Sequence, residues 1–363
     1  MPYRFADLSL ASYDKRLGAI AVEVAEQTIS LADDNGEAEA GVEMPSAANP
    51  NEEIKSMSYD ASPRSGSSIG LVGDQGGAVT LGAFLRIVTD GTPKYFAMTC
   101  SHVLSTSKVP TTPGNGPSVV CPADKDNFHW WLLAEDVIRD FSHCQRTAIS
   151  QHQAAEDAGA IQAAETQKRR CKASRHPAGT VYATSGLRTS VDHWVLDWAL
   201  VKLDANRFAF QKLHNIPSSL SRMNFKANLN HEAWNGIDWT PRAGAAFPAK
   251  DSPMFKIGRT SGHTAGQLHD IDASVTIDYK QHGLVKGKVC VVRSGEPNAF
   301  ASCGDSGALV LNGHAEAVGM VTAVAKGSVA SRAAYVSPFA PIVENIKEIL
   351  ERNGGEKVEV EFL

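Results

Sequence analysis

The chain of 363 residues carries 35 Lys and Arg against 40 Asp and Glu, which gives a net charge of −5. A mildly acidic chain has no long-range attraction for nucleic acid or for an anionic membrane, so we expect neither partner. Apolar residues make up 43% of the sequence, enough for a packed core, which excludes a wholly disordered chain. The sequence has no apolar run of about 18 residues, so no transmembrane segment is expected.

The first 68 residues are predicted to form an extension that precedes the folded units. Residues 14–32 place apolar side chains at near-helical spacing, which predicts a short amphipathic helix. Residues 33–68 are rich in acidic residues, Pro, Ser, Asn and Gly, a composition typical of a flexible linker.

The start of the chain and the six cysteines bear on the cellular compartment. Acidic residues interrupt the apolar stretch at 17–27, whereas a secretory signal needs an uninterrupted apolar segment. The cysteines are sparse and form no CxxC pair. We therefore expect reduced thiols and an intracellular, cytoplasmic location.

Residues 69–204 have the composition of a β unit. Six segments rich in β-branched and aromatic residues are separated by Gly, Pro and Asp, the pattern of short strands joined by turns. These candidate strands are 69–72, 79–87, 94–100, 118–121, 179–187 and 195–203.

A segment of different composition interrupts this unit. Residues 134–172 are rich in Ala, Gln and Glu and lack Pro, which predicts a helical insertion, with a break between two helices near Gly159. Residues 205–252 show no clear periodicity and are expected to connect the first β unit to a second one.

Residues 253–340 form the second series of candidate strands, again six. They are 254–260, 267–279, 288–293, 307–311, 315–324 and 333–338. Residues 341–363 are predicted to contain a terminal helix and a tail, because Pro341 suits a first helical turn and Gly354 a stop. The expected fold is thus mainly β, with two six-stranded units and a C-terminal helix.

The sharpest chemical signal is the sequence SCGDSGALVL at residues 302–311. Ser306 lies between Gly304-Asp305 and Gly307, directly before an apolar strand. A serine hydroxyl becomes a nucleophile when a base removes its proton and nearby amides stabilise the resulting oxyanion. The glycines allow the backbone amides of Gly304 and Ser306 to point at one spot. The alternative is an ordinary turn between strands, since Gly, Asp and Ser are common turn residues.

Two further residues complete a possible catalytic set. His102 follows an apolar strand in FAMTCSHVL, a suitable place for a general base. Asp197 is the acid inside the apolar run 195–201, where a half-buried carboxylate needs a partner such as an imidazole. Asp192 and Asp204 are the rival acids, but the first lies outside the strand and the second ends it.

The order His, Asp, Ser is one of the known orders of a serine-protease triad. Residues 69–352 resemble the trypsin/chymotrypsin-like serine proteases, through TCSHV, LDWALVKL and SCGDSGALV. The stretch FKIGRTSGHTAGQL resembles a glycine-rich pattern of some intracellular or microbial members. The resemblance implies two six-stranded antiparallel β-barrels, with the active site between them. It implies Ser306 as nucleophile, His102 as base and acid, Asp197 as the orienting group, and an oxyanion hole at Gly304 and Ser306.

The resemblance also suggests how the enzyme selects substrates and becomes active. Phe300 and Val324 fall at the base and wall of the family's specificity pocket, so an apolar or small residue is expected before the scissile bond. Secreted members free an apolar amino terminus that pairs with the acid preceding the nucleophile, here Asp305. Cleavage after Ser68 could supply Ile69 for this purpose, but we expect activity without processing.

The predicted function is an intracellular serine endopeptidase that acts on protein or peptide substrates through an acyl-enzyme. It is expected to need no cofactor and no metal, and a regulatory partner could bind the N-terminal extension or the helical insertion. One alternative is a catalytically silent protease fold that serves as a binding or regulatory module. Another is a zinc protein, although the loose set of potential ligands matches no standard spacing. That set comprises Cys121, His129, His143, Cys144, His152, Cys171 and His176.

Overall fold

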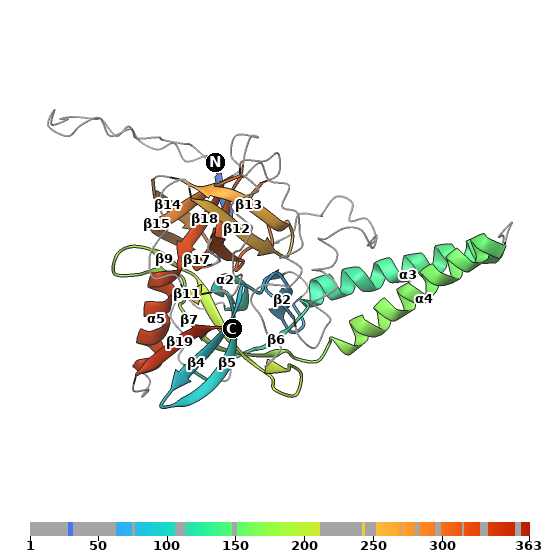
Figure 1. Cartoon of the computed structure of the whole chain (residues 1–363), viewed down its shortest axis with the longest axis horizontal. Helices are drawn as coiled ribbons and strands as arrows, with labels where there is room; N and C mark the ends of the chain where they lie inside the picture. The colour runs from blue at the N-terminus through green and yellow to red at the C-terminus, as the bar shows by residue number, and fades with distance from the viewer. Residues whose placement is uncertain are drawn as a thin grey trace.

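The computed structural model describes most of the chain from residue 63 onward, together with one short segment before it. The described residues are 28–31, 63–74, 77–105, 113–114, 116–146, 151–210, 242–243, 252–269, 271–279, 283–294, 299–313, 316–326, 333–352 and 357–363. Two β units lie one above the other, and a long helical hairpin extends to one side of the lower unit (Figure 1).

The first unit is a closed antiparallel barrel. Its strands are β2 (Ser68–Leu71), β3 (Val79–Thr80), β4 (Ala83–Thr89), β5 (Thr92–Cys100), β6 (Ser118–Val120), β7 (Gly179–Thr184) and β10 (Trp198–Leu203). Around the ring, β4 pairs with β5, then β10, β7, β6 and β2 follow. The ring closes because β2 pairs with β3, which runs on directly into β4. With β3 and β4 counted as one strand, the barrel has the six strands that the sequence predicts.

The second unit closes in the same way. Its ring runs β17, β16, β12, β13, β15 and β18, and β18 returns to β17. The strands are β12 (Pro253–Gly258), β13 (Gly262–Leu268), β15 (Leu284–Arg293), β16 (Leu309–Asn312), β17 (Glu316–Lys326) and β18 (Ala333–Pro338). The predicted mainly β fold with two six-stranded antiparallel barrels is therefore confirmed.

One predicted strand of the second barrel is wrong in detail. Residues 267–279 do not form one strand, because β13 ends at Leu268 and β14 (Ala273–Asp278) follows as a separate strand. β14 pairs with β15 outside the ring. β13 and β14 both run antiparallel to β15, but Leu268 is paired with Val292 and Ala273 with Val289, so the segment has more residues between its two pairings than β15 has and the strand is interrupted there.

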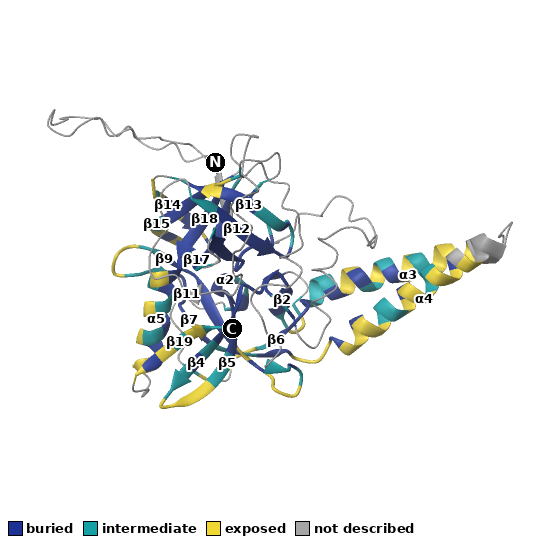
Figure 2. Cartoon of the chain, viewed as in Figure 1, coloured by how far each residue is buried: buried dark blue, intermediate teal, exposed yellow. Residues whose placement is uncertain are grey.

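The helical insertion consists of α3 (Asp124–Arg146) and α4 (Gln151–Ala173), which lie between β6 and β7 of the first barrel. It begins earlier than the predicted start at residue 134, and Gly159 lies inside α4, so the predicted break at that glycine is wrong. The outer faces of both helices are exposed along the hairpin, whereas the barrel interiors are buried (Figure 2).

Two strands near the ends of the chain were not predicted. β1 (Thr28–Leu31) pairs antiparallel with β17, so these four residues are not part of the helix predicted over 14–32. The rest of that helix and the linker up to residue 62 lie outside the described residues. β19 (Val358–Phe362) pairs with β4 on the outside of the first barrel.

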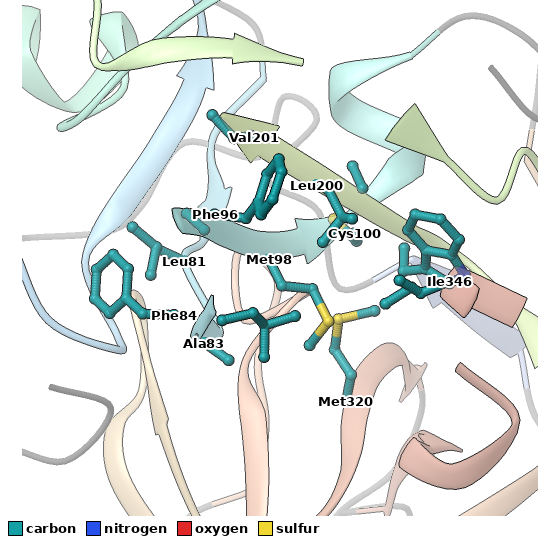
Figure 3. Close-up of a cluster of buried hydrophobic side chains, with 14 of the residues drawn as sticks. Leu81, Ala83, Phe84, Phe96, Met98, Cys100, Leu200, Val201, Met320 and Ile346 are labelled. Atoms are coloured by element: carbon teal, nitrogen blue, oxygen red, sulfur yellow. The ribbon is translucent and has the colours of Figure 1, made fainter. Parts of the chain in front are cut away.

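The largest hydrophobic cluster joins the two barrels to α5 (Phe339–Glu351), the predicted C-terminal helix. It includes Met98 of β5, Met320 of β17 and Ile346 of α5 (Figure 3). Burial of these side chains fixes one barrel against the other, which gives the active-site residues a rigid base.

Candidate active site

His102 and Asp197 form a buried pair in the first barrel. His102 lies in α2 (Ser101–Leu104), the short turn after β5, and Asp197 lies between β9 (Val195–Leu196) and β10. Nδ1 of His102 is 2.5 Å from Oδ2 of Asp197. The other carboxylate oxygen, Oδ1, accepts hydrogen bonds from the amides of Ser101 and His102, at 2.8 and 2.9 Å. These bonds fix the tautomer of the imidazole, with Nδ1 bonded to the carboxylate and Nε2 directed elsewhere.

The surroundings of the imidazole determine its basicity. Burial lowers the pKa of His102, but the charge of Asp197 and the nearby Cys100 more than offset this, so the net pKa is well above 6.5. Cys100 Sγ lies 3.9 Å from Nε2. The ring of Tyr279 lies 5.9 Å from that of His102, centroid to centroid, and its hydroxyl is buried without a hydrogen-bond partner among the described residues.

Ser306 lies in the loop before β16 of the second barrel and is fully buried. Its hydroxyl donates a hydrogen bond to the carbonyl of Thr322, at 3.2 Å, and not to His102. The loop turns through two glycines in the left-handed region, Gly304 at φ 95° and Gly307 at φ 87°. A side chain at either position would strain the backbone, so the sequence Gly-Asp-Ser-Gly permits this turn.

Contacts between the barrels bring this loop to the His102 segment. The amide of Thr80 donates to the carbonyl of Ser306, at 2.9 Å. A Cβ atom built on Gly307 would lie 2.4 Å from Oγ1 of Thr99 and 3.0 Å from the amide nitrogen of Cys100. The residue after Ser306 therefore packs against the strand that ends two residues before His102.

The loop also presents unpaired backbone donors. Within the described residues, no acceptor bonds the amide of Gly304 or that of Ser306, whereas the amide of Asp305 between them bonds the carbonyl of Ser302. Two free amides on one loop, separated by a single residue, can together stabilise an anionic oxygen.

Asp305 is neutralised by a buried lysine. Nζ of Lys256, a residue of β12, lies 3.0 Å from Oδ2 of Asp305, and both side chains are fully buried. The amides of Thr260 and Ser302 donate to the same carboxylate, each at 2.9 Å, as does the hydroxyl of Ser261. Burial raises the pKa of Asp305, but Lys256 and these donors outweigh it, so the net pKa is below 3.8. Asp305 is therefore a carboxylate that holds the loop in one conformation.

Phe300 and Val324, the predicted pocket residues, belong to one buried cluster of the second barrel. Phe300 is fully buried, and Val324 is 5% exposed. The ring of Phe300 lies 5.8 Å from Nζ of Lys256, and its carbonyl accepts a hydrogen bond from Thr264.

The model of peptidase family S64 matches residues 88–354. The chain belongs to peptidase family S64. The S64 peptidase is thus a serine endopeptidase, as the sequence predicted, and its substrates are proteins or peptides. Among curated proteins, none matches its sequence.

Several solved structures are similar to the S64 peptidase at 14% identity. One, described as a glutamic acid-specific serine protease that uses a histidine triad in substrate binding, has a TM-score of 0.39 and covers 83% of this chain and 100% of its own. Thermobifida fusca protease A has a TM-score of 0.39 and covers 78% and 94%. Cellulomonas bogoriensis chymotrypsin has a TM-score of 0.37 and covers 81% and 96%.

The structure of the S64 peptidase also bears on the rival acids, the metal site, the membrane span and the cysteines considered from the sequence. Asp192 and Asp204, the rival acids, are exposed. The described residues contain no cluster of His, Cys, Asp and Glu that could hold a metal ion. No helix within the described ranges is long and apolar enough to cross a membrane. Among the cysteines whose side chains the structure describes, none forms a disulfide; they are Cys100, Cys121, Cys171, Cys290 and Cys303.

Lys256 is the site residue that sequence reasoning missed. It occupies a buried position of an apolar strand, MFKIG, and a lysine in such a place requires a counter-charge. That signal was available in the sequence, but the partner was not, because Asp305 lies far along the chain.

Proposed function

We propose that the S64 peptidase hydrolyses peptide bonds through Ser306, His102 and Asp197 and an acyl-enzyme intermediate. The observation that carries this proposal is the buried His102–Asp197 pair, next to a serine loop with two free amides. Neither a turn nor a structural histidine would require both features together.

In this mechanism the hydroxyl of Ser306 first turns from the carbonyl of Thr322 toward Nε2 of His102. His102 accepts the hydroxyl proton while Oγ attacks the scissile carbonyl, and Asp197 stabilises the imidazolium that forms. The amides of Gly304 and Ser306 bind the oxyanion. His102 then gives its proton to the leaving amine, which departs and leaves an acyl-Ser306 ester. Water attacks this ester in the second half of the cycle, with His102 again as base.

Lys256 supports the proposal that activity requires no amino-terminal processing. The acid before the nucleophile already has an internal cation, since the ammonium of Lys256 bonds Asp305. Ile69, the candidate new terminus, is a buried residue of β2 paired with Val79. A cleaved terminus would therefore have no unpaired carboxylate to meet at Asp305.

For specificity, we propose an apolar or small residue before the scissile bond. Phe300 and Val324 place no carboxylate in the cluster that would line the pocket, and the nearby Lys256 is already neutralised by Asp305. Cleavage of a peptide library strictly after Arg or Lys would contradict this proposal.

The intracellular setting is also part of the proposal. The absence of disulfides among the described cysteines is compatible with a reducing compartment. Localisation of the tagged full-length chain by microscopy tests it.

The decisive experiment is labelling of the purified full chain with a fluorophosphonate probe, which reacts with an activated serine. We expect the wild-type protein to be labelled, and both Ser306→Ala and His102→Ala to remain folded but unlabelled. Absence of labelling in the folded wild-type protein would instead favour a silent binding module. The hydrogen bond from Ser306 to Thr322, rather than to His102, is the observation that keeps this second candidate in view.

A further inference from the structure

Arg259 connects the helical insertion to the active-site loop. It lies in the turn between β12 and β13, and its side chain is 7% exposed. Nε of Arg259 donates to Oδ2 of Asp126, at 2.5 Å, and Nη2 donates to Oδ1 of the same residue. Asp126 lies in the first turn of α3, where the insertion leaves the first barrel. This two-pronged pairing fixes the plane and direction of the guanidinium.

The guanidinium that Asp126 holds packs directly against Gly304. A Cβ atom built on Gly304 would lie 2.3 Å from Nη1 of Arg259 and 2.2 Å from Oγ1 of Thr260. Nη1 also donates a hydrogen bond to Oγ1 of Thr260, at 3.2 Å. Only a glycine can occupy this position while the guanidinium keeps its place.

The backbone of Arg259 restrains the same residue from a second direction. Its amide donates to Oγ1 of Thr80, at 2.9 Å, and that hydroxyl donates to the carbonyl of Gly304, again at 2.9 Å. Arg259 thus meets Gly304 at its Cα through the side chain and at its carbonyl through Thr80. These two restraints hold Gly304 at its Cα and at the peptide plane that follows it, and so limit how far the loop that carries its amide can move.

We propose that Arg259, oriented by Asp126 of the insertion, is a positioning residue that aims the amide of Gly304 into the oxyanion hole. This inference rests on the proposed function, because it assigns a role to that amide in catalysis. Without the carboxylate of Asp126, the guanidinium loses the two-pronged pairing that sets its plane, and we expect it to shift away from Gly304. The insertion is thereby a working part of the active site.

A structural role for the pair predicts different behaviour. If Asp126 and Arg259 only fasten the hairpin to the barrel, breaking the pair lowers stability, but the protein that remains folded reacts at the normal rate. If the pair positions Gly304, the folded protein still binds the probe, but its serine reacts more slowly, because the transition state loses a correctly aimed donor.

The test compares Asp126→Asn with Asp136→Asn in the full chain. Asp136 is a matched control, since it is an exposed carboxylate of the same helix paired with Arg139. The rate of fluorophosphonate labelling is measured against probe concentration, which separates binding from the chemical step. We expect Asp126→Asn to slow the maximal rate by ~10-fold or more, with half-saturation changed by less than about 2-fold. Asp136→Asn should leave both quantities unchanged.

Hydrogen exchange of the peptide covering residues 300–307 gives a readout that does not depend on activity. We expect faster exchange in Asp126→Asn than in Asp136→Asn. If a folded Asp126→Asn matches the control in both labelling and exchange, the positioning role is overturned. If the wild-type protein is not labelled but the exchange difference is present, the Asp126–Arg259 pair does restrain the loop at 300–307. In that case the proposed peptidase mechanism is the part that fails.

A charge swap separates fastening from positioning further. The double variant Asp126→Arg/Arg259→Asp restores a pair between insertion and barrel, but leaves no guanidinium on the turn beside Gly304. We expect recovered thermal stability with labelling still slow; recovery of both would contradict the proposal. If Asp126→Asn does not fold, Asp126→Glu takes its place, because the longer side chain keeps the charge but displaces the guanidinium. The labelling rate and the hydrogen exchange of this variant are judged in the same way.

Discussion

Lys256 shows why a single buried charge can control the site. Moving an ammonium out of water is costly, and the nearby carboxylate of Asp305 offsets this cost only while both groups are present. Accordingly, burial lowers the pKa of Lys256 below 10.5 although Asp305 opposes the shift. Asp305 directly precedes Ser306, so loss of either charge should disturb the conformation of the loop that carries the nucleophile.

We expect Lys256→Met to abolish probe labelling and to destabilise the protein by about 3–5 kcal/mol, because Asp305 is left as an uncompensated buried charge. Lys256→Arg, which keeps the cation, should retain part of both properties. Urea unfolding and labelling of the same samples measure the two effects. Wild-type labelling in Lys256→Met would show that Asp305 needs no internal cation.

At low pH, the dependence of the labelling rate on pH should follow the titration of His102. His102 is a base only when neutral, and its pKa is raised above 6.5, so the rate should fall as the pH drops, with a midpoint above 6.5. Asp197→Asn removes the charge that offsets burial and should lower that midpoint. NMR titration of the His102 ring in both proteins measures the shift, even where the variant is too slow to label.

The alkaline limb should belong to Lys256. As the pH rises through the lowered pKa of Lys256, the ammonium loses its proton and Asp305 loses its counter-charge. The labelling rate should therefore fall with rising pH, with a midpoint lower than 10.5. Lys256→Arg should move this decline to higher pH, because a guanidinium stays charged. An unchanged alkaline limb in that variant would assign the decline to another group.

For single residues, the sequence was enough to predict those that stand in a local motif. It was not enough for those whose role depends on a partner far along the chain. Ser306 stood out by its glycine neighbours, and Asp197 by its position in an apolar strand. Arg259 and Asp126 gave no such signal. Their importance arises because folding brings together a strand turn and a helix start that lie 133 residues apart.

At the scale of elements, α5 contributes more than its terminal position suggests. Ile342, Ile346 and Ile349 are buried in the cluster that spans both barrels. Asn345 of the same helix accepts a hydrogen bond from the indole of Trp198, at 3.2 Å, directly beside Asp197. The helix therefore stabilises the start of β10, the strand that directly follows the acid of the proposed triad.

We expect Ile346→Ala to lower the free energy of unfolding by about 2–5 kcal/mol, because it opens a cavity in this cluster. Glu344→Ala, at an exposed position of the same helix, is the control and should change stability little. Urea denaturation measures both. At temperatures where Ile346→Ala is folded, labelling should be close to normal; strongly reduced labelling would mean that α5 also sets the active-site geometry.

The elements themselves were predicted unevenly, for physical reasons. The apolar strands and α5 have periodic patterns, and the structure agrees with most of them. Gly159 was expected to break the insertion, but its side of α4 is exposed, where a glycine costs only about 1 kcal/mol and leaves the helix intact. The short strands β1 and β19 depend on pairing partners from other parts of the chain, which no local pattern indicates.

At the scale of the whole molecule, β1 matters through the edge that it occupies. β18 lines one edge of β17 at Ala323 and Val324, so β1, which pairs with the same residues, must lie along the opposite edge. That edge runs on from Thr322, whose carbonyl bonds Ser306. An extended peptide that adds a strand beside the nucleophile would need the same backbone groups.

A peptide bound in that way and residues 28–31 would exclude each other, because one row of backbone amides and carbonyls cannot pair with two strands at once. A tethered strand competes at an effective concentration of about millimolar, so it is a strong rival for a dilute substrate. We expect Ile29→Pro, which disrupts β1 pairing, to lower KM for a cleavable peptide and to leave kcat unchanged. An unchanged KM would mean that substrates approach Ser306 along another path; a lower one would make vacating this edge the first event of every turnover.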